Sequence, residues 1–214
     1  MSAEASIARD GVHTRRWVAA CLADALLAAG WAFFAFRAFM HWRTSGSPAM
    51  LLLFAVNSLF AALFVFRRRG AVVSDDPRHW TATAATVLLS FCFRGGEAPR
   101  WLAAAGQVGQ AAGLLIVLLA LASLGRSFGL VPANRGVKVS GLYRLVRHPL
   151  YGAEIIVYVS FVAGNLGLHN LLVLAGILCG LCYRAGVEES FLAQDDEYSG
   201  YLHRVRYRFI PGVY

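Results

Sequence analysis

The sequence predicts an all-α, polytopic integral membrane protein with five to six transmembrane helices. Three observations predict this fold class: 58% of the 214 residues are apolar, only 15% are charged, and the apolar residues occur in long blocks. Soluble domains contain about 45–50% apolar and about 25% charged residues. The composition therefore indicates a chain whose surroundings are partly lipid.

The first two blocks are the clearest candidate spans. Residues 17–36 contain one ionisable side chain, Asp24, and residues 49–66 contain none before Arg67. A helix needs roughly 20 apolar residues to cross the hydrocarbon core, so both blocks are predicted to cross. A carboxylate at membrane depth is costly, so we expect Asp24 to be paired or protonated. A proton-coupled transporter would use such a group.

The third and fourth blocks differ in length. Residues 80–93 are few and rich in threonine, whose hydroxyl groups can bond to helix carbonyls, so this block is the weakest candidate span. Residues 101–124 are long enough to cross with tilt. They include Gly109-x-x-x-Gly113, a spacing that allows close helix approach in lipid.

The fifth and sixth blocks are predicted to form a tight helical hairpin near the C-terminus. They comprise residues 150–168 and 170–183, and Gly167 and His169 lie at their junction. The sixth block also contains the small-residue pair Gly176 and Gly180, which indicates a further close helix contact.

The distribution of Lys and Arg predicts the orientation. If all six blocks cross, sixteen of the twenty Lys and Arg residues lie on one side; if 80–93 does not cross, the split is eleven to nine. Cytoplasmic loops carry the excess of these residues, so we predict six crossings with both termini cytoplasmic. A multi-pass protein of the bacterial inner membrane fits this pattern, although the endoplasmic reticulum obeys the same rule.

Composition and spacing argue against several partners. The net charge of +8 lies in short clusters between apolar blocks, which do not assemble a nucleic-acid-binding surface. No disulfide framework or metal site is predicted from the cysteine spacing. All four cysteines lie in apolar blocks, where we expect buried thiols: Cys21, Cys92, Cys179 and Cys182.

Polar residues of the second half gather in two stretches, 127–154 and 184–214, so we divide the chain into N-terminal helices (1–125) and a polar C-terminal part (126–214). Pro149 can begin a helix because its missing N–H would be unpaired there. Arg147 and His148 would then lie at a helix N-terminus, which favours an anion. If the hairpin forms, both stretches meet on the cytoplasmic face.

These two stretches combine cations, a histidine, a carboxylate pair and tyrosines. A lone interfacial Arg usually anchors at lipid headgroups, but this set is richer than anchoring requires. A ligand with an ammonium and a carboxylate would need it, and an aromatic face could hold a sulfonium by a cation–π contact.

Three motifs carry a resemblance to a known family. The run G-L-Y-R-L-V-R-H-P-L-Y at 141–151 is followed by E-E-S-F-L at 188–192 and by Glu197-Tyr198-x-x-Tyr201. This order resembles the isoprenylcysteine carboxyl methyltransferase family and the related phospholipid N-methyltransferases, over roughly residues 124–214. The family often has Gly two residues after the motif Tyr; here that position is Ala153, and the glycine is Gly152.

The resemblance implies an integral-membrane enzyme that transfers a methyl group from S-adenosylmethionine to a lipophilic acceptor, with membrane lipids as its surroundings. It implies a cytoplasmic cofactor pocket capped by the C-terminal segment. The implied cofactor-binding residues are Tyr143, Arg147, His148, Pro149, Leu150, Tyr151, Glu188 and Glu189; the implied catalytic residues are Arg184 and Glu188; the implied substrate-binding residues are Tyr198, Tyr201 and Arg206.

The motifs are compatible with more than one methyl acceptor. We expect carboxyl O-methylation of an isoprenylcysteine-like or other lipid-soluble substrate, with a phospholipid (phosphatidylethanolamine-type) N-methyltransferase as the alternative. We expect His148 mainly to organise the cofactor, and it or a glutamate would act as base for an amine or phenol acceptor. Outside enzymes, the alternative is a small membrane transporter or lipid-binding protein. The sequence does not predict an oligomeric state.

Overall fold

The computed structural model describes residues 3–68, 73–74, 76–130 and 133–213, with side chains of the first helix described from residue 20 onward. Within these ranges the chain is all-helical apart from loops and three isolated β-bridges. The helices are α1 (Ala3–Ser45), α2 (Pro48–Phe66), α3 (Pro77–Ser90), α4 (Arg100–Leu124), α5 (Pro149–Gly164), α6 (Leu168–Leu192) and α7 (Asp196–Arg204), with short 3₁₀ turns η1 (Gly125–Ser127) and η2 (Gly141–Arg144). The predicted all-α fold class is confirmed.

Four helices are long and apolar enough to cross a membrane. They are α2, α6, residues Ala20–Ser45 of α1, and Arg100–Ser127, which joins α4 to η1. The 14 residues of α3 and the 16 residues of α5 form shorter helices, about 21 Å and about 24 Å at 1.5 Å per residue. The hydrocarbon core is about 30 Å thick, so the predicted crossings by residues 80–93 and 150–168 stay predictions.

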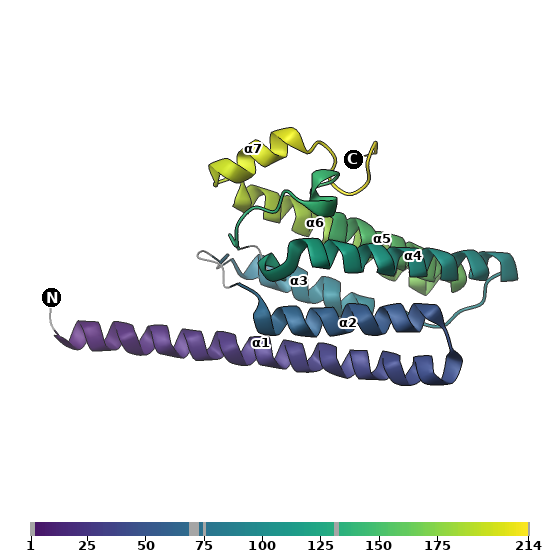
Figure 1. Ribbon diagram of the computed structural model, residues 1–214, viewed down its shortest axis with the longest axis horizontal. Coiled ribbons are helices and arrows are strands. Elements are labelled where there is room, and N and C mark those ends of the chain that lie inside the picture. Colours follow the sequence, from purple (N-terminus) through teal and green to yellow (C-terminus); the bar gives the residue numbers. More distant parts are fainter. Residues whose placement is uncertain (1–2, 69–72, 75, 131–132, 214) are drawn as a thin grey trace.

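The helices lie side by side, and their connections gather at two opposite ends (Figure 1). At one end, the backbone N–H of Arg68 donates to the carbonyl of Arg126 at 2.6 Å. At the other end, the backbone N–H of Gly96 donates to Asn165 Oδ1 at 3.1 Å, which joins the α3–α4 connection to the α5–α6 turn. Arg69, part of the basic cluster in the charge count, lies outside the described residues.

Small residues bring helices together where the sequence predicts close approach. A Cβ at Gly113 would lie 2.7 Å from Val157 Cγ2, and a Cβ at Gly109 would overlap the side chain of Ser160. These glycines let α4 pack along α5, which is its most extensive partner. On α6, a Cβ at Gly180 would overlap Thr86 of α3. Helix packing thus accounts for both small-residue motifs.

The hairpin of α5 and α6 has a three-residue turn between Gly164 and Leu168. Although the two helices are consecutive, α5 packs mainly on α4, and α6 packs mainly on α3. Leu150 and Ala153 of α5 belong to the same core as Phe64 of α2 and Leu121 of α4. Residues on both sides of the expected boundary at 125 therefore share one core.

Asp24 has a partner. Its carboxylate forms an ion pair with the guanidinium of Arg67, just after α2, and both side chains are less than one-fifth exposed. The Arg67 guanidinium also lies 5.2 Å from the centroid of the Phe64 ring. The expectation of a paired Asp24 is met, and this pair provides no unpaired carboxylate for a transport pathway.

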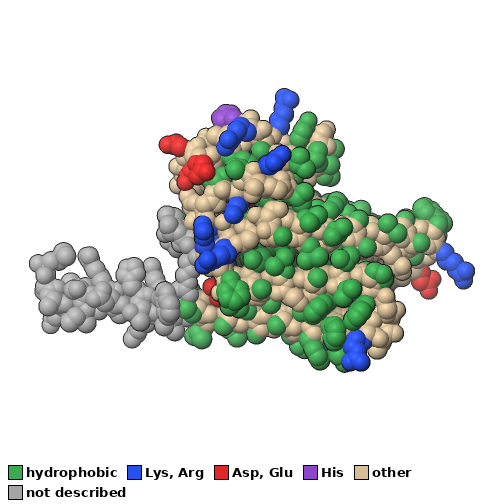
Figure 2. Space-filling view, in the orientation of Figure 1, with side chains coloured by type: hydrophobic (Ala, Val, Ile, Leu, Met, Phe, Trp, Pro, Cys, Tyr) green, Lys and Arg blue, Asp and Glu red, His purple; other side chains and the backbone are tan. Residues whose placement is uncertain are grey.

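The expectation of buried cysteines is wrong for three of the four. Cys92, Cys179 and Cys182 are exposed, and Cys21 is half-buried. Their surroundings are apolar because hydrophobic side chains form a broad band over the helices, while Lys and Arg gather toward the ends and around α7 (Figure 2). In a bilayer this band would face lipid, so an apolar block does not require its small side chains to face the protein core.

Residues 205–213, here called the C-terminal segment, return to the start of α5 (Figure 1). The backbone N–H groups of Arg147 and His148 donate to the carbonyls of Tyr207 and Arg208 at 2.9 and 2.8 Å. A Cβ at Gly152 would lie 2.6 Å from the carbonyl oxygen of Phe209. Gly152 therefore serves close approach by the chain's own C-terminal segment.

Candidate functional site

Glu189 is the centre of a cluster of charges beneath the C-terminal segment. Its carboxylate accepts from Arg208 Nη2 at 2.6 Å and Nε at 3.1 Å, and from Arg147 Nη1 at 3.3 Å. His148 Nε2 lies 3.1 Å from the same carboxylate. The Glu189 side chain is only 10% exposed, so three elements, α6, the start of α5 and the C-terminal segment, meet at one buried carboxylate.

The side chain of Arg147 also binds backbone carbonyl groups of the C-terminal segment. The Arg147 Nε donates to the carbonyl of Val205 at 2.8 Å, and Nη2 donates to the carbonyl of Arg206 at 3.0 Å. Arg147 is also one of the residues that line the polar cavity, which is described below. Its guanidinium is bound to Glu189 and to the carbonyls of Val205 and Arg206. The Arg206 side chain itself is exposed and lines neither of the two main cavities.

Glu188 has a different environment from its neighbour. Tyr151 Oη donates to Glu188 Oε2 at 3.1 Å, and His148 Nδ1 lies 3.8 Å from the same oxygen. The rings of His148 and Tyr151 are parallel, with centroids 5.3 Å apart. The Glu188 side chain is 34% exposed and lines a cavity, so this carboxylate can still meet a ligand.

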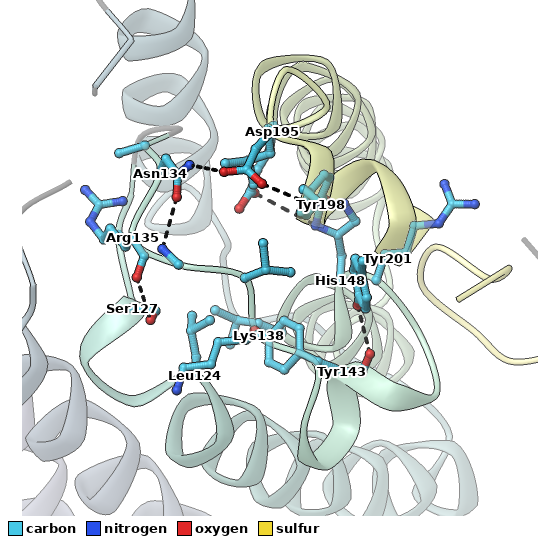
Figure 3. A pocket seen from close by; sticks show the side chains of 18 of the residues that line it. Leu124, Ser127, Asn134, Arg135, Lys138, Tyr143, His148, Asp195, Tyr198 and Tyr201 are labelled. Atoms are coloured by element: carbon cyan, nitrogen blue, oxygen red, sulfur yellow. Dashed lines mark hydrogen bonds and ion pairs between the residues drawn. The ribbon is translucent and has the colours of Figure 1, made fainter. Parts of the chain in front are cut away.

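The cavity beside Glu188, here called the polar cavity, lies between the loop after α4 and the α7 region. It encloses about 830 Å³ including its open mouth. Figure 3 shows Asn134 and Arg135 along one side, His148 and Tyr201 on the opposite side, and Lys138 between them. The sequence-predicted site residues that line it are Tyr143, Arg147, His148, Leu150, Tyr151, Glu188, Tyr198 and Tyr201.

Pro149 and Glu189 are not among the residues that line the polar cavity. Pro149 is buried at the first turn of α5, which agrees with its predicted place at a helix start. Tyr201 Oη donates to the carbonyl of Tyr143 at 2.8 Å, which ties α7 to η2. Burial raises the pKa of Tyr143, Tyr198 and Tyr201 above their ordinary value, so these phenols stay protonated at neutral pH.

The loop between η1 and η2 contributes a side of the polar cavity that motif reasoning missed. Asn134 Nδ2 donates to Asp195 Oδ2 at 2.8 Å. Asp195 Oδ1 accepts from the backbone N–H groups of Glu197 and Tyr198, and so caps α7. Burial lowers the pKa of Arg135, also in this wall, to about 10. An acidic residue just before a helix is a recognisable N-cap signal, but its pairing with Asn134 is a tertiary contact.

A second cavity, here called the apolar cavity, lies among the helices and encloses about 2010 Å³ including open space. Its lining comes from α1 to α6 and the residues after η1, with side chains such as Trp31, Phe60 and Phe161. Gly129, Leu150 and Tyr151 line both cavities. Leu150 and Tyr151 therefore form a wall with a polar space on one side and an apolar space on the other.

Arg184 lies at the apolar side of this wall. Its guanidinium carbon is 5.0 Å from the centroid of the Tyr151 ring, and its Nη2 donates to the carbonyl of Leu130 at 3.2 Å. Arg184 lines the apolar cavity and is 9% exposed. The structure thus brings Arg184 and Glu188, the two implied catalytic residues, to opposite sides of Tyr151.

No protein-family model matches the chain, and no curated protein matches it in sequence. The observations define an all-helical protein with four membrane-length apolar helices, a polar cavity and a larger apolar cavity that share a wall.

Proposed function

We propose that the protein is a membrane methyltransferase that transfers a methyl group from S-adenosylmethionine to a lipophilic acceptor. The observation that carries this proposal is the shared wall of Leu150 and Tyr151. A reaction between a water-soluble donor and a lipid requires two binding spaces of opposite polarity that meet at one point. The two cavities have this arrangement, and the resemblance of residues 141–151 and 188–192 to a methyltransferase family supports it.

The residues of the polar cavity fit the proposed cofactor chemically. Glu188 provides an accessible carboxylate for an ammonium group, and Lys138 provides a cation for a carboxylate. Tyr143, Tyr151 and Tyr198 provide aromatic faces for a positively charged sulfur. When bound, S-adenosylmethionine supplies an activated methyl group.

His148 is proposed as a positioning residue. Its ring lies parallel to that of Tyr151 and between the carboxylates of Glu188 and Glu189. It can therefore fix the orientation of Tyr151 at the shared wall and of Glu188 in the polar cavity.

On the acceptor side, apolar side chains exclude water and hold the lipid chain. Arg184 offers a guanidinium next to Tyr151, and guanidinium groups bind carboxylates in fixed geometry. This supports carboxyl O-methylation as the proposed reaction. An acceptor that is already a carboxylate needs little acid–base chemistry, so positioning and water exclusion are the main contributions of the protein.

The proposal is tested by calorimetric titration of the detergent-solubilised protein with S-adenosylhomocysteine. We expect wild-type protein to bind, His148→Ala to lose binding, and His203→Ala, on the exposed face of α7, to bind like wild type. Absence of binding by correctly folded wild-type protein would refute the methyltransferase proposal. Normal binding by His148→Ala with loss of turnover would instead make His148 a general base.

A further inference from the structure

Glu154 is a carboxylate that none of the described interactions explains. It lies on α5, one helical turn after Tyr151, and lines the apolar cavity. Among the residues that the structure describes, no hydrogen bond or ion pair to its side chain is found. An unpaired carboxylate among apolar side chains is energetically costly, and such residues commonly mark a binding site.

The position of Glu154 relative to Arg184 restricts the ligand. Both side chains line the apolar cavity, both neighbour Tyr151, and their charges interact without an ion pair within 4 Å. Glu154 is the acidic residue among those that line the apolar cavity. The lining contains two arginines, Arg184 and Arg37, and Arg37 comes from α1. The cavity wall next to Tyr151 thus presents one anionic and one cationic group, while its remainder is mostly apolar.

We infer that Glu154 and Arg184 form a headgroup subsite for a zwitterionic lipid, in which Glu154 binds the ammonium group and Arg184 binds the anionic group. The apolar cavity then holds the chain, and the headgroup lies at the wall with the polar cavity. As a statement about the methyl acceptor, this inference rests on the proposed function. It deepens that function by requiring a positively charged nitrogen near the anionic group of the acceptor.

Two sources share this chemistry: aminophospholipids, with a phosphate, and lipidated amino acids, with a carboxylate. The first experiment measures lipid retention by native mass spectrometry, without S-adenosylmethionine. The probes are phosphatidylethanolamine, S-farnesylcysteine with a free amino group, and the N-acetylated form of each. We expect wild-type protein to retain at least one free-amine lipid about tenfold better than its acetylated form.

The matched variants are Glu154→Gln, which keeps the shape of the side chain, and Glu97→Gln, which changes an exposed carboxylate at the far end of the bundle. We expect Glu154→Gln to lose the preference for the free amine and to bind the acetylated lipids unchanged. Glu97→Gln should keep the preference. Glu154 is only partly buried, so the loss of its charge should not unfold the protein. S-adenosylhomocysteine binding by both variants reports that the polar cavity is intact.

A methyl-transfer assay with labelled S-adenosylmethionine then assigns the source. We expect Glu154→Gln to raise KM for the free-amine acceptor about tenfold, with a smaller change in kcat. The inference is overturned if wild-type protein retains free-amine and acetylated lipids equally, or if Glu154→Gln leaves the preference unchanged. Retention without S-adenosylhomocysteine binding would refute the methyltransferase proposal while supporting the lipid subsite.

Discussion

Glu189 shows how one residue can hold a chain terminus in place. Its carboxylate binds side chains that come from the start of α5 and from the C-terminal segment. The motif places Glu188 and Glu189 next to each other, yet the structure gives them separate surroundings: Glu189 is surrounded by the protein's own cations, and Glu188 lines a cavity. At the level of single residues, neighbours in a motif can have different roles.

Replacement of Glu189 should release the C-terminal segment. Glu189→Gln removes the ion pairs with Arg208 and Arg147 and leaves cations facing one another, at an expected cost of about 2–4 kcal/mol. We expect faster hydrogen exchange and proteolysis within residues 205–213. Glu197→Gln, at an exposed position on α7, is the control. Equal protection in both variants would contradict a central role for Glu189.

The sequence predicts which residues lie near the site better than it predicts their contacts. Tyr143, His148 and Tyr151 are recognisable because they belong to a compact motif in a polar stretch. The partner of Asp24 is 43 positions away in sequence, and nothing in its local pattern identifies Arg67. Glu154 lies within an apolar block, and its place in a cavity depends on packing by helices far away in sequence.

At the scale of elements, helix ends follow from capping groups rather than from hydropathy. The apolar block at 80–93 predicts that the helix begins at residue 80. The helix α3 begins earlier, at Pro77, because the Asp76 side chain caps it by accepting a hydrogen bond from the backbone N–H of Arg78. The block at 150–168 overestimates α5, which ends at Gly164. The block at 170–183 underestimates α6, which continues to Leu192 because its polar last turns are covered by the C-terminal segment and the start of α5.

The close approach of two elements at Gly152 gives a direct test of the C-terminal contact. Gly152→Ala places a methyl group against the backbone of Phe209, which cannot rotate away, so we expect the C-terminal segment to be displaced. Gly186→Ala is the matched control, because a Cβ there meets nothing within 4 Å and alanine favours helix. Limited proteolysis should cut residues 205–213 faster in the first variant alone. Identical cleavage of the two variants would show that the contact is absent in solution.

The cap of α7 predicts a pH dependence. Hydrogen bonds from Asn134 and from the backbone of Tyr198 and Glu197 lower the pKa of Asp195 below its ordinary value of 3.8. A carboxylate whose pKa is lowered by folding stabilises the folded state at pH values above the pKa that it has in the unfolded chain. This stabilisation is lost as the pH falls through the pKa of the folded state.

We therefore expect the amide resonances of Glu197 and Tyr198 to shift as the pH is lowered below about 4. Asp195→Asn, which can still cap the helix but does not titrate, should remove the shift. A shift of equal size in Asp195→Asn would assign the titration to another group.

For the whole molecule, long apolar blocks are sufficient to predict helices, because lipid requires every backbone polar group to be paired within the segment, and four of these helices reach membrane length. They are not sufficient to predict which helices pack together. Consecutive helices α5 and α6 are each packed mainly on another partner, α4 and α3. Those partnerships depend on the shapes around Gly113 and Gly180, which a hydropathy pattern does not contain.

The two ends of the bundle give a prediction of orientation. In a cysteine-free background, single cysteines at positions 97 and 196 lie at opposite ends of the described structure. If the end with most Lys and Arg is cytoplasmic, a membrane-impermeant thiol reagent added to intact cells should label Glu97→Cys. Asp196→Cys should be labelled only after permeabilisation. Labelling of both variants in intact cells, or of Asp196→Cys alone, would contradict the orientation.

The wall formed by Leu150 and Tyr151 has an energetic consequence for the proposed reaction. Extracting an acyl or prenyl chain into water costs about 0.8 kcal/mol per CH₂ group, or about 12 kcal/mol for a fifteen-carbon chain. Since the apolar cavity lies among the helices and reaches Tyr151, the hydrocarbon chain of the proposed acceptor can stay in apolar surroundings during the reaction. The soluble partner comes to the wall from the other side, so only a one-carbon group has to pass between the two media.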